Sequence, residues 1–90
     1  MNKGYRKELV HVLSCIKNPA MMDEFLQDLL TPEELNAITT RWQIVKQLAA
    51  SMPQRKIAKK LGVSIAKITR GSRELYDKEG GFWKVLKMKK

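Results

Sequence analysis

The chain has 90 residues, of which 43% are hydrophobic, and a formal net charge of +9. Its length suits one domain near the lower size limit for burying a core, and its composition excludes a disordered chain. A core this small is often enlarged by oligomerisation, so we expect a dimer. The single cysteine excludes an intramolecular disulfide and any multi-cysteine metal site.

The positive charge is concentrated in the second half of the chain. Residues 1–50 carry six basic and six acidic side chains, whereas residues 51–90 carry twelve basic and three acidic ones. This asymmetry indicates a polyanion partner for the C-terminal half. No long apolar run is present, so we expect no membrane span, no secretory signal and a reducing, cytoplasmic location.

Two amphipathic helices are predicted at the N-terminal end, over residues 3–16 and 19–29. The first has apolar residues at helical spacing: Tyr5, Leu9, Val12, Leu13 and Ile16. Asn18 is a good cap for the second, with Pro19 at its first position. That helix presents Met21, Met22, Phe25, Leu26, Leu29 and Leu30. His11 and Cys15, four residues apart, could touch on the first helix, but packing is the simpler interpretation.

A third helix is predicted from Pro32 to about Ala50. Thr31 can cap it, and Glu34 can reach back to complete a capping box. Its apolar positions are Leu35, Ile38, Trp42, Val45, Leu48 and Ala49.

Residues 54–75 follow the pattern of a helix-turn-helix. Ala58, Gly62 four positions later and Ile68 six after that have the spacing typical of this motif. Gly62 supplies a left-handed turn, and Ser64 can cap the second helix. Ile65, Ile68 and Leu75 form its predicted inward stripe, with Ala66 and Thr69 beside them.

The second helix of this motif enters the major groove of DNA, and its first residues reach base edges. We therefore expect ten DNA-contacting residues: Gln54, Arg55, Lys56, Lys59, Ser64, Ile65, Ala66, Lys67, Thr69 and Arg73. Arginine to guanine is the commonest base contact, which suits Arg55, whereas the lysines mostly meet phosphates. A solvated helical hairpin with a cationic face is the alternative to DNA binding.

The chain after Tyr76 is predicted to end the motif at residues 77–81. A short amphipathic helix with Phe82, Val85 and Leu86 follows, and Lys87, Lys89 and Lys90 form a basic tail. No strand pattern is present, so the expected fold class is all-α. We expect one domain over 1–90: core and dimerisation helices over 1–50, the helix-turn-helix over 53–76, and the short helix and tail over 77–90.

Several motifs resemble the bacterial tryptophan repressor family. They are Ile68-Thr69-Arg70-Gly71-Ser72 with Gln54-Arg55 and Gly62, and Leu30-Thr31-Pro32-Glu33-Glu34 with Thr40-Arg41 and Ile44-Val45. The matches span about residues 28–75. The resemblance implies an intertwined, all-helical homodimer that binds a double-stranded DNA operator. It also implies a corepressor pocket between the central and recognition helices, completed by the partner chain.

The resemblance assigns six residues to that pocket: Leu30, Thr31, Arg41, Arg70, Gly71 and Glu74. Arg41 and Arg70 match the arginines that sandwich an indole, and guanidinium groups do stack on aromatic faces and pair with carboxylates. Arg70 would hold the ligand carboxylate with help from Thr31, Gly71 would leave room for the ring, and the Leu30 carbonyl would accept from the ammonium. Arg41 could instead be a surface ion-pair residue, and Arg70 a plain phosphate contact.

The chain departs from the family pattern at several positions. Glu74 stands where the family has a serine that binds the ligand amino group; it could take the ammonium or neutralise Arg70 or Arg73. Asp28 replaces a leucine and Lys67 a threonine, the linker before Pro53 is one residue shorter, and the tail GGFWKVLK replaces a longer helix. That tail resembles a related, tryptophan-repressor-like branch.

The leading hypothesis is a sequence-specific transcriptional repressor controlled by L-tryptophan or a related aromatic corepressor, with no other cofactor. An effector-independent DNA-binding protein is the second, and a protein-interaction module the third. No nucleophile–base pair, paired-carboxylate site or phosphate-binding loop indicates an enzyme. The operator sequence and the regulated genes do not follow from these residues.

Overall fold

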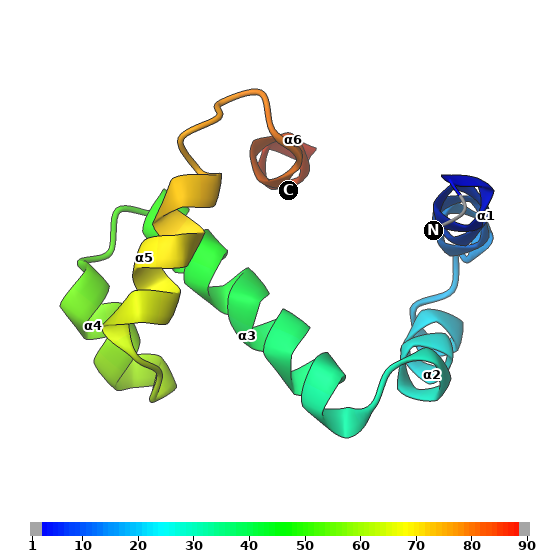
Figure 1. Cartoon of the computed structure of the whole chain (residues 1–90), viewed down its shortest axis with the longest axis horizontal. Helices are drawn as coiled ribbons and strands as arrows, with labels where there is room; N and C mark the ends of the chain where they lie inside the picture. Colours follow the sequence, from blue (N-terminus) through cyan, green and yellow to red (C-terminus); the bar gives the residue numbers. More distant parts are fainter. Residues whose placement is uncertain (1–2, 89–90) are drawn as a thin grey trace. The chain divides into compact units, whose positions relative to one another are not determined.

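The computed structural model describes residues 3–88, and these form six helices and no strand (Figure 1). The helices are α1 (Lys3–Cys15), α2 (Pro19–Leu29), α3 (Pro32–Ala49), α4 (Gln54–Leu61), α5 (Ile65–Glu74) and α6 (Gly81–Met88). The all-α prediction is therefore confirmed. The first five helices end within a residue or so of their expected positions, and α6 includes Gly81, which was expected to lie in the preceding stop. No helix within residues 3–88 combines the length and apolarity that a membrane span requires.

The chain divides into two compact units, one ending at Leu35 and the other beginning at Asn36, so the division falls inside α3. A single domain over 1–90 stays a prediction.

The N-terminal unit is formed by local signals. Asn18 caps α2 through its Oδ1, which accepts from the backbone N–H of Ala20 at 2.8 Å and of Met21 at 3.1 Å. In α1 the His11 Nε2 and Cys15 Sγ lie 3.6 Å apart on the exposed surface. Neither α1 nor α2 has a buried residue in the single chain: Tyr5 is 68% exposed and Met21 57%. These helices therefore present apolar side chains that a second chain could cover.

The core of the C-terminal unit is formed by one isoleucine from each of three helices. Ile44 of α3, Ile57 of α4 and Ile68 of α5 pack together and are at most 3% exposed. Val45 is also fully buried. Figure 1 shows α4 and α5 beside the C-terminal half of α3, with a loop leading from α5 to α6. Burying each of these side chains contributes roughly 1.5–3 kcal/mol, so this cluster holds α4 and α5 on α3.

One expectation about apolar faces is wrong in part. Ile65 was expected in the inward stripe of α5, but it is 46% exposed, whereas Ile68, three residues later, is fully buried in the core. Of the apolar positions on α3, Val45 is buried and Ile38 is 37% exposed in the single chain, and Ile44, which was not among the expected positions, is buried. Ile68 and Leu75 are buried as expected.

Candidate DNA interface and effector site

The turn between α4 and α5 has the geometry that the helix-turn-helix pattern predicts. Gly62 ends α4 in the left-handed conformation, with φ 67° and ψ 36°. The Ala58 carbonyl accepts from the N–H groups of both Gly62 and Val63, the latter at 3.1 Å. Ser64 then caps α5, its Oγ accepting from the Lys67 N–H at 3.3 Å. These contacts are all local, so the turn is specified by neighbouring residues.

The two helices of the motif pack on each other through Ile57 and Ile68, both fully buried. The half-buried Ala58 packs against the same cluster, where its small side chain permits a close crossing. At the other end, Thr69 Oγ1 lies 3.5 Å from Gln54 Oε1, at the outer limit for a hydrogen bond. The first residue of α4 is thus next to the middle of α5.

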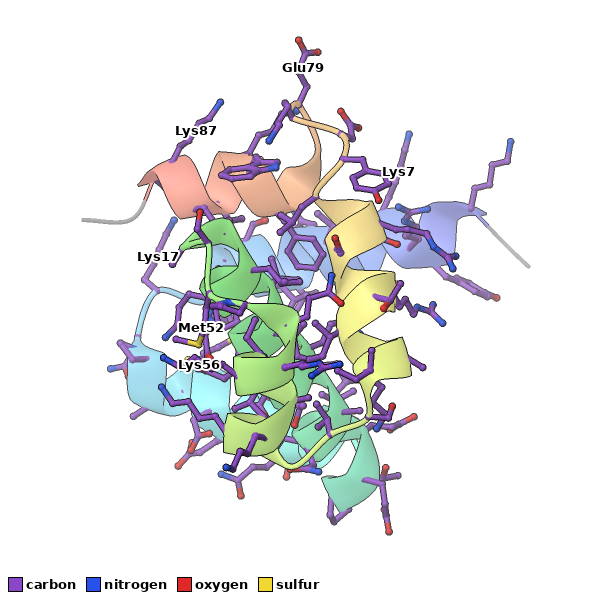
Figure 2. All side chains as sticks on the ribbon, turned by 90° about the vertical axis from the view of Figure 1, so that its left-hand side faces the viewer. Lys7, Lys17, Met52, Lys56, Glu79 and Lys87 are labelled. Atoms are coloured by element: carbon purple, nitrogen blue, oxygen red, sulfur yellow. The ribbon has the colours of Figure 1, made fainter. Side chains whose placement is uncertain are left out.

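The ten expected DNA-contacting residues lie on α4, at the Ser64 cap and along α5. Nine of them are exposed: Arg55, Lys56, Lys59, Ser64, Ile65, Ala66, Lys67, Thr69 and Arg73. Gln54 is half-buried against Thr69. Figure 2 shows the side chain of Lys56 projecting from α4 into solvent. Between Gln54 and Leu75, seven cations stand with one acid, so this surface attracts phosphates.

Three of the expected corepressor residues, Arg41 on α3 and Arg70 and Glu74 on α5, project from two helices that touch. The contact is at Gly71, the buried position of α5 where an added Cβ would lie 2.9 Å from Ile44 Cγ2 of α3. Arg41 lies one helical turn before Ile44, and Arg70 and Glu74 are one turn apart on α5. Gly71 thus lets the helices approach closely, and Ile44 takes the space that the missing side chain leaves.

Arg41, Arg70 and Glu74 are all exposed. Within residues 3–88, Glu74 forms no ion pair with Arg70 or Arg73. All three charged groups are therefore open to a ligand or to DNA.

The two remaining corepressor residues, Leu30 and Thr31, belong to the N-terminal unit. The Thr31 N–H donates to Glu34 Oε1 at 2.8 Å and Thr31 Oγ1 accepts from the Glu34 N–H at 3.1 Å, which confirms the capping box. The Thr31 hydroxyl still has its own proton to donate. Leu30 is half-buried, and its backbone N–H donates to the Leu26 carbonyl at 2.9 Å.

Aromatic contacts made by α6 were not anticipated from the sequence. Phe82 stacks on Trp42 of α3 with ring centroids 6.5 Å apart, and Trp83 Nε1 donates to the Leu75 carbonyl at 2.9 Å. The signal that could have indicated them is the pair of adjacent aromatic residues directly after Gly80-Gly81.

The family model described as "Trp repressor protein" matches residues 6–90, almost the whole chain. The chain belongs to the Trp repressor family.

Individual relatives of this Trp repressor family member come from several bacteria. A protein named "Trp operon repressor homolog" from Chlamydia caviae is 40% identical over 81 residues, 89% of this chain and 80% of that protein. One of the same name from Actinobacillus succinogenes is 53% identical over 53 residues, 58% of this chain and 52% of that protein. One of the same name from Haemophilus influenzae is 45% identical over 65 residues, 71% of this chain and 64% of that protein. The aligned segments thus span between about half and four fifths of these relatives.

Trp repressor family members are regulatory DNA-binding proteins without a cofactor in the enzymatic sense. The chain is therefore a DNA-binding transcriptional repressor and not an enzyme. The exposed, cationic helix-turn-helix is the part of the structure that suits this role.

Proposed function

We propose that this repressor acts as a homodimer on a double-stranded DNA operator, and that L-tryptophan or a related aromatic amino acid is its corepressor. The observation that carries the proposal is the Ile44–Gly71 contact. It joins the helix bearing Arg41 to the recognition helix α5, which bears Arg70 and Glu74. A ligand that bridges these two helices would brace the recognition helix.

The chemistry of the exposed groups suits an amino acid. A guanidinium pairs with a carboxylate and stacks on an aromatic ring, which assigns the ligand carboxylate to Arg70 and the ring to the space between Arg41 and Arg70. The carboxylate of Glu74 would take the ammonium. The roles of Leu30 and Thr31, which belong to the N-terminal unit, stay predictions from the family resemblance.

The dimer is supported by the apolar side chains that α1 and α2 leave exposed. Leu9 is 40% exposed, Val10 55% and Leu29 46%. Such a surface on a chain of 90 residues favours a second copy as its partner. Because the relatives are bacterial proteins and the proposed partner is operator DNA, we further propose a cytoplasmic location.

The test is a DNA-binding titration with and without L-tryptophan, on a duplex recovered by selecting random-sequence DNA with the wild-type protein. Ligand and operator should each raise the other's affinity, because linkage is reciprocal, with a coupling on the order of 1–3 kcal/mol. Arg41→Ala should abolish the response to tryptophan and leave weak, unregulated binding. Glu74→Ser should keep tryptophan binding, whereas Glu74→Ala should weaken it.

The result that contradicts corepressor control is an operator affinity unchanged by tryptophan and by indole analogues. The protein would then bind DNA without an effector, the second hypothesis from the sequence. Equal affinity for selected and scrambled duplexes would instead contradict operator recognition.

A further inference from the structure

Helix α6 is attached to two other helices of the C-terminal unit by adjacent aromatic residues. The Phe82 ring stacks on Trp42 of α3, with 29° between the ring planes, and the Trp83 indole donates to the Leu75 carbonyl just after α5. We call Phe82 and Trp83 the aromatic clasp. It connects α3 to the C-terminal end of α5 independently of the isoleucine core.

The indole bond is made where the recognition helix ends. The Leu75 N–H donates to the Ser72 carbonyl and the Tyr76 N–H donates to the Arg73 carbonyl, each at 3.1 Å. These two bonds tighten the last turn. The Leu75 carbonyl, two residues after Arg73, accepts the Trp83 N–H at 2.9 Å. A half-buried indole N–H needs an acceptor, because it can only donate. The bond thus satisfies both groups and holds the end of α5.

The loop that leads to the clasp is itself ordered by hydrogen bonds. Asp77 accepts the Gly80 N–H on its carbonyl and the Glu79 N–H on its Oδ1, both at 3.0 Å. Lys78 places its Nζ 4.7 Å from the centroid of the Trp83 ring, a favourable cation–π contact. Figure 2 shows Glu79 pointing away from the helices, so this loop leaves its acidic side chain in solvent. A loop already ordered in this way loses little entropy when the clasp closes.

The residues that the clasp touches are neighbours of residues proposed to bind the effector. Trp42 follows Arg41 on α3, and Leu75 follows Glu74 at the end of α5. We propose that the aromatic clasp positions the recognition helix for base reading when no effector is bound, and so sets the operator affinity of the ligand-free repressor. Phe82 and Trp83 are positioning residues, since neither is on the DNA-binding helices. The inference rests on the DNA-binding role of α5.

The effect of the clasp on binding follows from populations. If only the chain with a positioned α5 reads the operator, the apparent dissociation constant is the intrinsic one divided by the fraction positioned. Losing one net hydrogen bond lowers the equilibrium constant for positioning by roughly 2- to 10-fold. Without effector we take the positioned α5 to be the minor form, so the fraction positioned and the apparent affinity fall by the same factor. Non-specific attraction between lysines and phosphates does not require the helix angle, so it should be unaffected.

The experiment compares full-length wild type with Trp83→Phe, which keeps an aromatic ring and removes the N–H donor. Both are titrated without tryptophan against the selected operator and a scrambled duplex of equal length. The operator affinity of Trp83→Phe should fall by roughly 2- to 10-fold, with scrambled binding unchanged. Val85→Ala is the matched control, because Val85 is on the same helix, is 48% exposed and lies outside the clasp. It should bind as wild type does.

Several outcomes would overturn the clasp. One is an operator affinity of Trp83→Phe equal to that of wild type, and another is an equal loss on both duplexes. If Trp83→Phe loses its helical circular dichroism, Phe82→Leu, which keeps apolar volume but removes the stacking on Trp42, takes its place with the same expectations. Loss of helicity in both variants would also contradict the proposal, because the pair would then hold the fold rather than position one helix.

The clasp and the proposed function fail in distinguishable ways. If tryptophan leaves the operator affinity of the wild-type protein unchanged, only the corepressor proposal is contradicted, because the effect of the clasp is measured without ligand. A wild type without operator preference contradicts operator recognition and the clasp together. Operator preference that is insensitive to Trp83→Phe contradicts only the clasp.

Discussion

Replacing Gly71 with alanine tests the closest approach between α3 and the recognition helix. The added Cβ would lie 2.9 Å from Ile44 Cγ2, 3.6 Å from Leu48 Cδ1 and 3.9 Å from Val45 Cγ2. The first distance is roughly 0.6–1.1 Å shorter than an ordinary carbon–carbon contact of 3.5–4.0 Å. Ile44 cannot relieve it by a simple rotation, because it is 3% exposed and β-branched side chains are stiff at χ1. The helices must therefore move apart.

Two opposing effects determine the size of the change. Overpacking typically costs about 1–3 kcal/mol, and replacing glycine within a helix returns about 1 kcal/mol. We expect Gly71→Ala to lower the free energy of unfolding by about 1 kcal/mol per chain. Gly81→Ala is the matched control: nothing lies within 4 Å of its added Cβ and its φ is not positive. It should stabilise by about 0.4–1 kcal/mol.

The assay is urea unfolding followed by circular dichroism at one fixed protein concentration, because the stability of a dimer depends on concentration. The double variant Ile44→Ala/Gly71→Ala removes the clash, so its loss of stability should be about 0.5–3 kcal/mol smaller than the sum of the single losses. The reasoning is refuted if Gly71→Ala is as stable as Gly81→Ala, or if the two single losses simply add.

Further predictions concern DNA, the turn and assembly. Arg55→Ala should weaken operator binding and relax base preference at one position by about 1–3 kcal/mol. Lys59→Ala should instead lower affinity evenly across sequences and make the slope of affinity against salt concentration shallower by about one unit. If the two variants behave identically on selected and scrambled duplexes, the assignment of Arg55 to a base contact is contradicted. Gly62→Ala should destabilise by about 1–2 kcal/mol through its left-handed backbone alone, because nothing lies within 4 Å of the added Cβ, and an unchanged urea midpoint would be the contrary result. Light scattering should find a dimer at micromolar concentration, and a stable folded monomer there would contradict the role proposed for α1 and α2.

The sequence by itself determined the elements whose hydrogen bonds are local. The caps at Asn18 and Thr31, the turn at Gly62 and the cap at Ser64 depend on partners within four or five residues, so the pattern of residue types specifies them. The cationic helix-turn-helix follows from spacing and charge, which also need no knowledge of distant contacts. The family followed from short runs of residues, which the match over residues 6–90 confirms.

The tertiary structure alone decided which apolar residues form the core and where distant helices touch. Ile38 was among the expected apolar positions of α3 and Ile44 was not, yet it is Ile44 that packs with Ile57 of α4 and Ile68 of α5 in the core. Gly71 was expected to leave room for a ligand ring, and the structure shows Ile44 in contact range there, while the ligand role stays a proposal. The bond from Trp83 to Leu75 depends on how the chain turns back after α5. Each of these depends on interhelical angles, which arise from many packing contacts at once and have no signature in neighbouring residues.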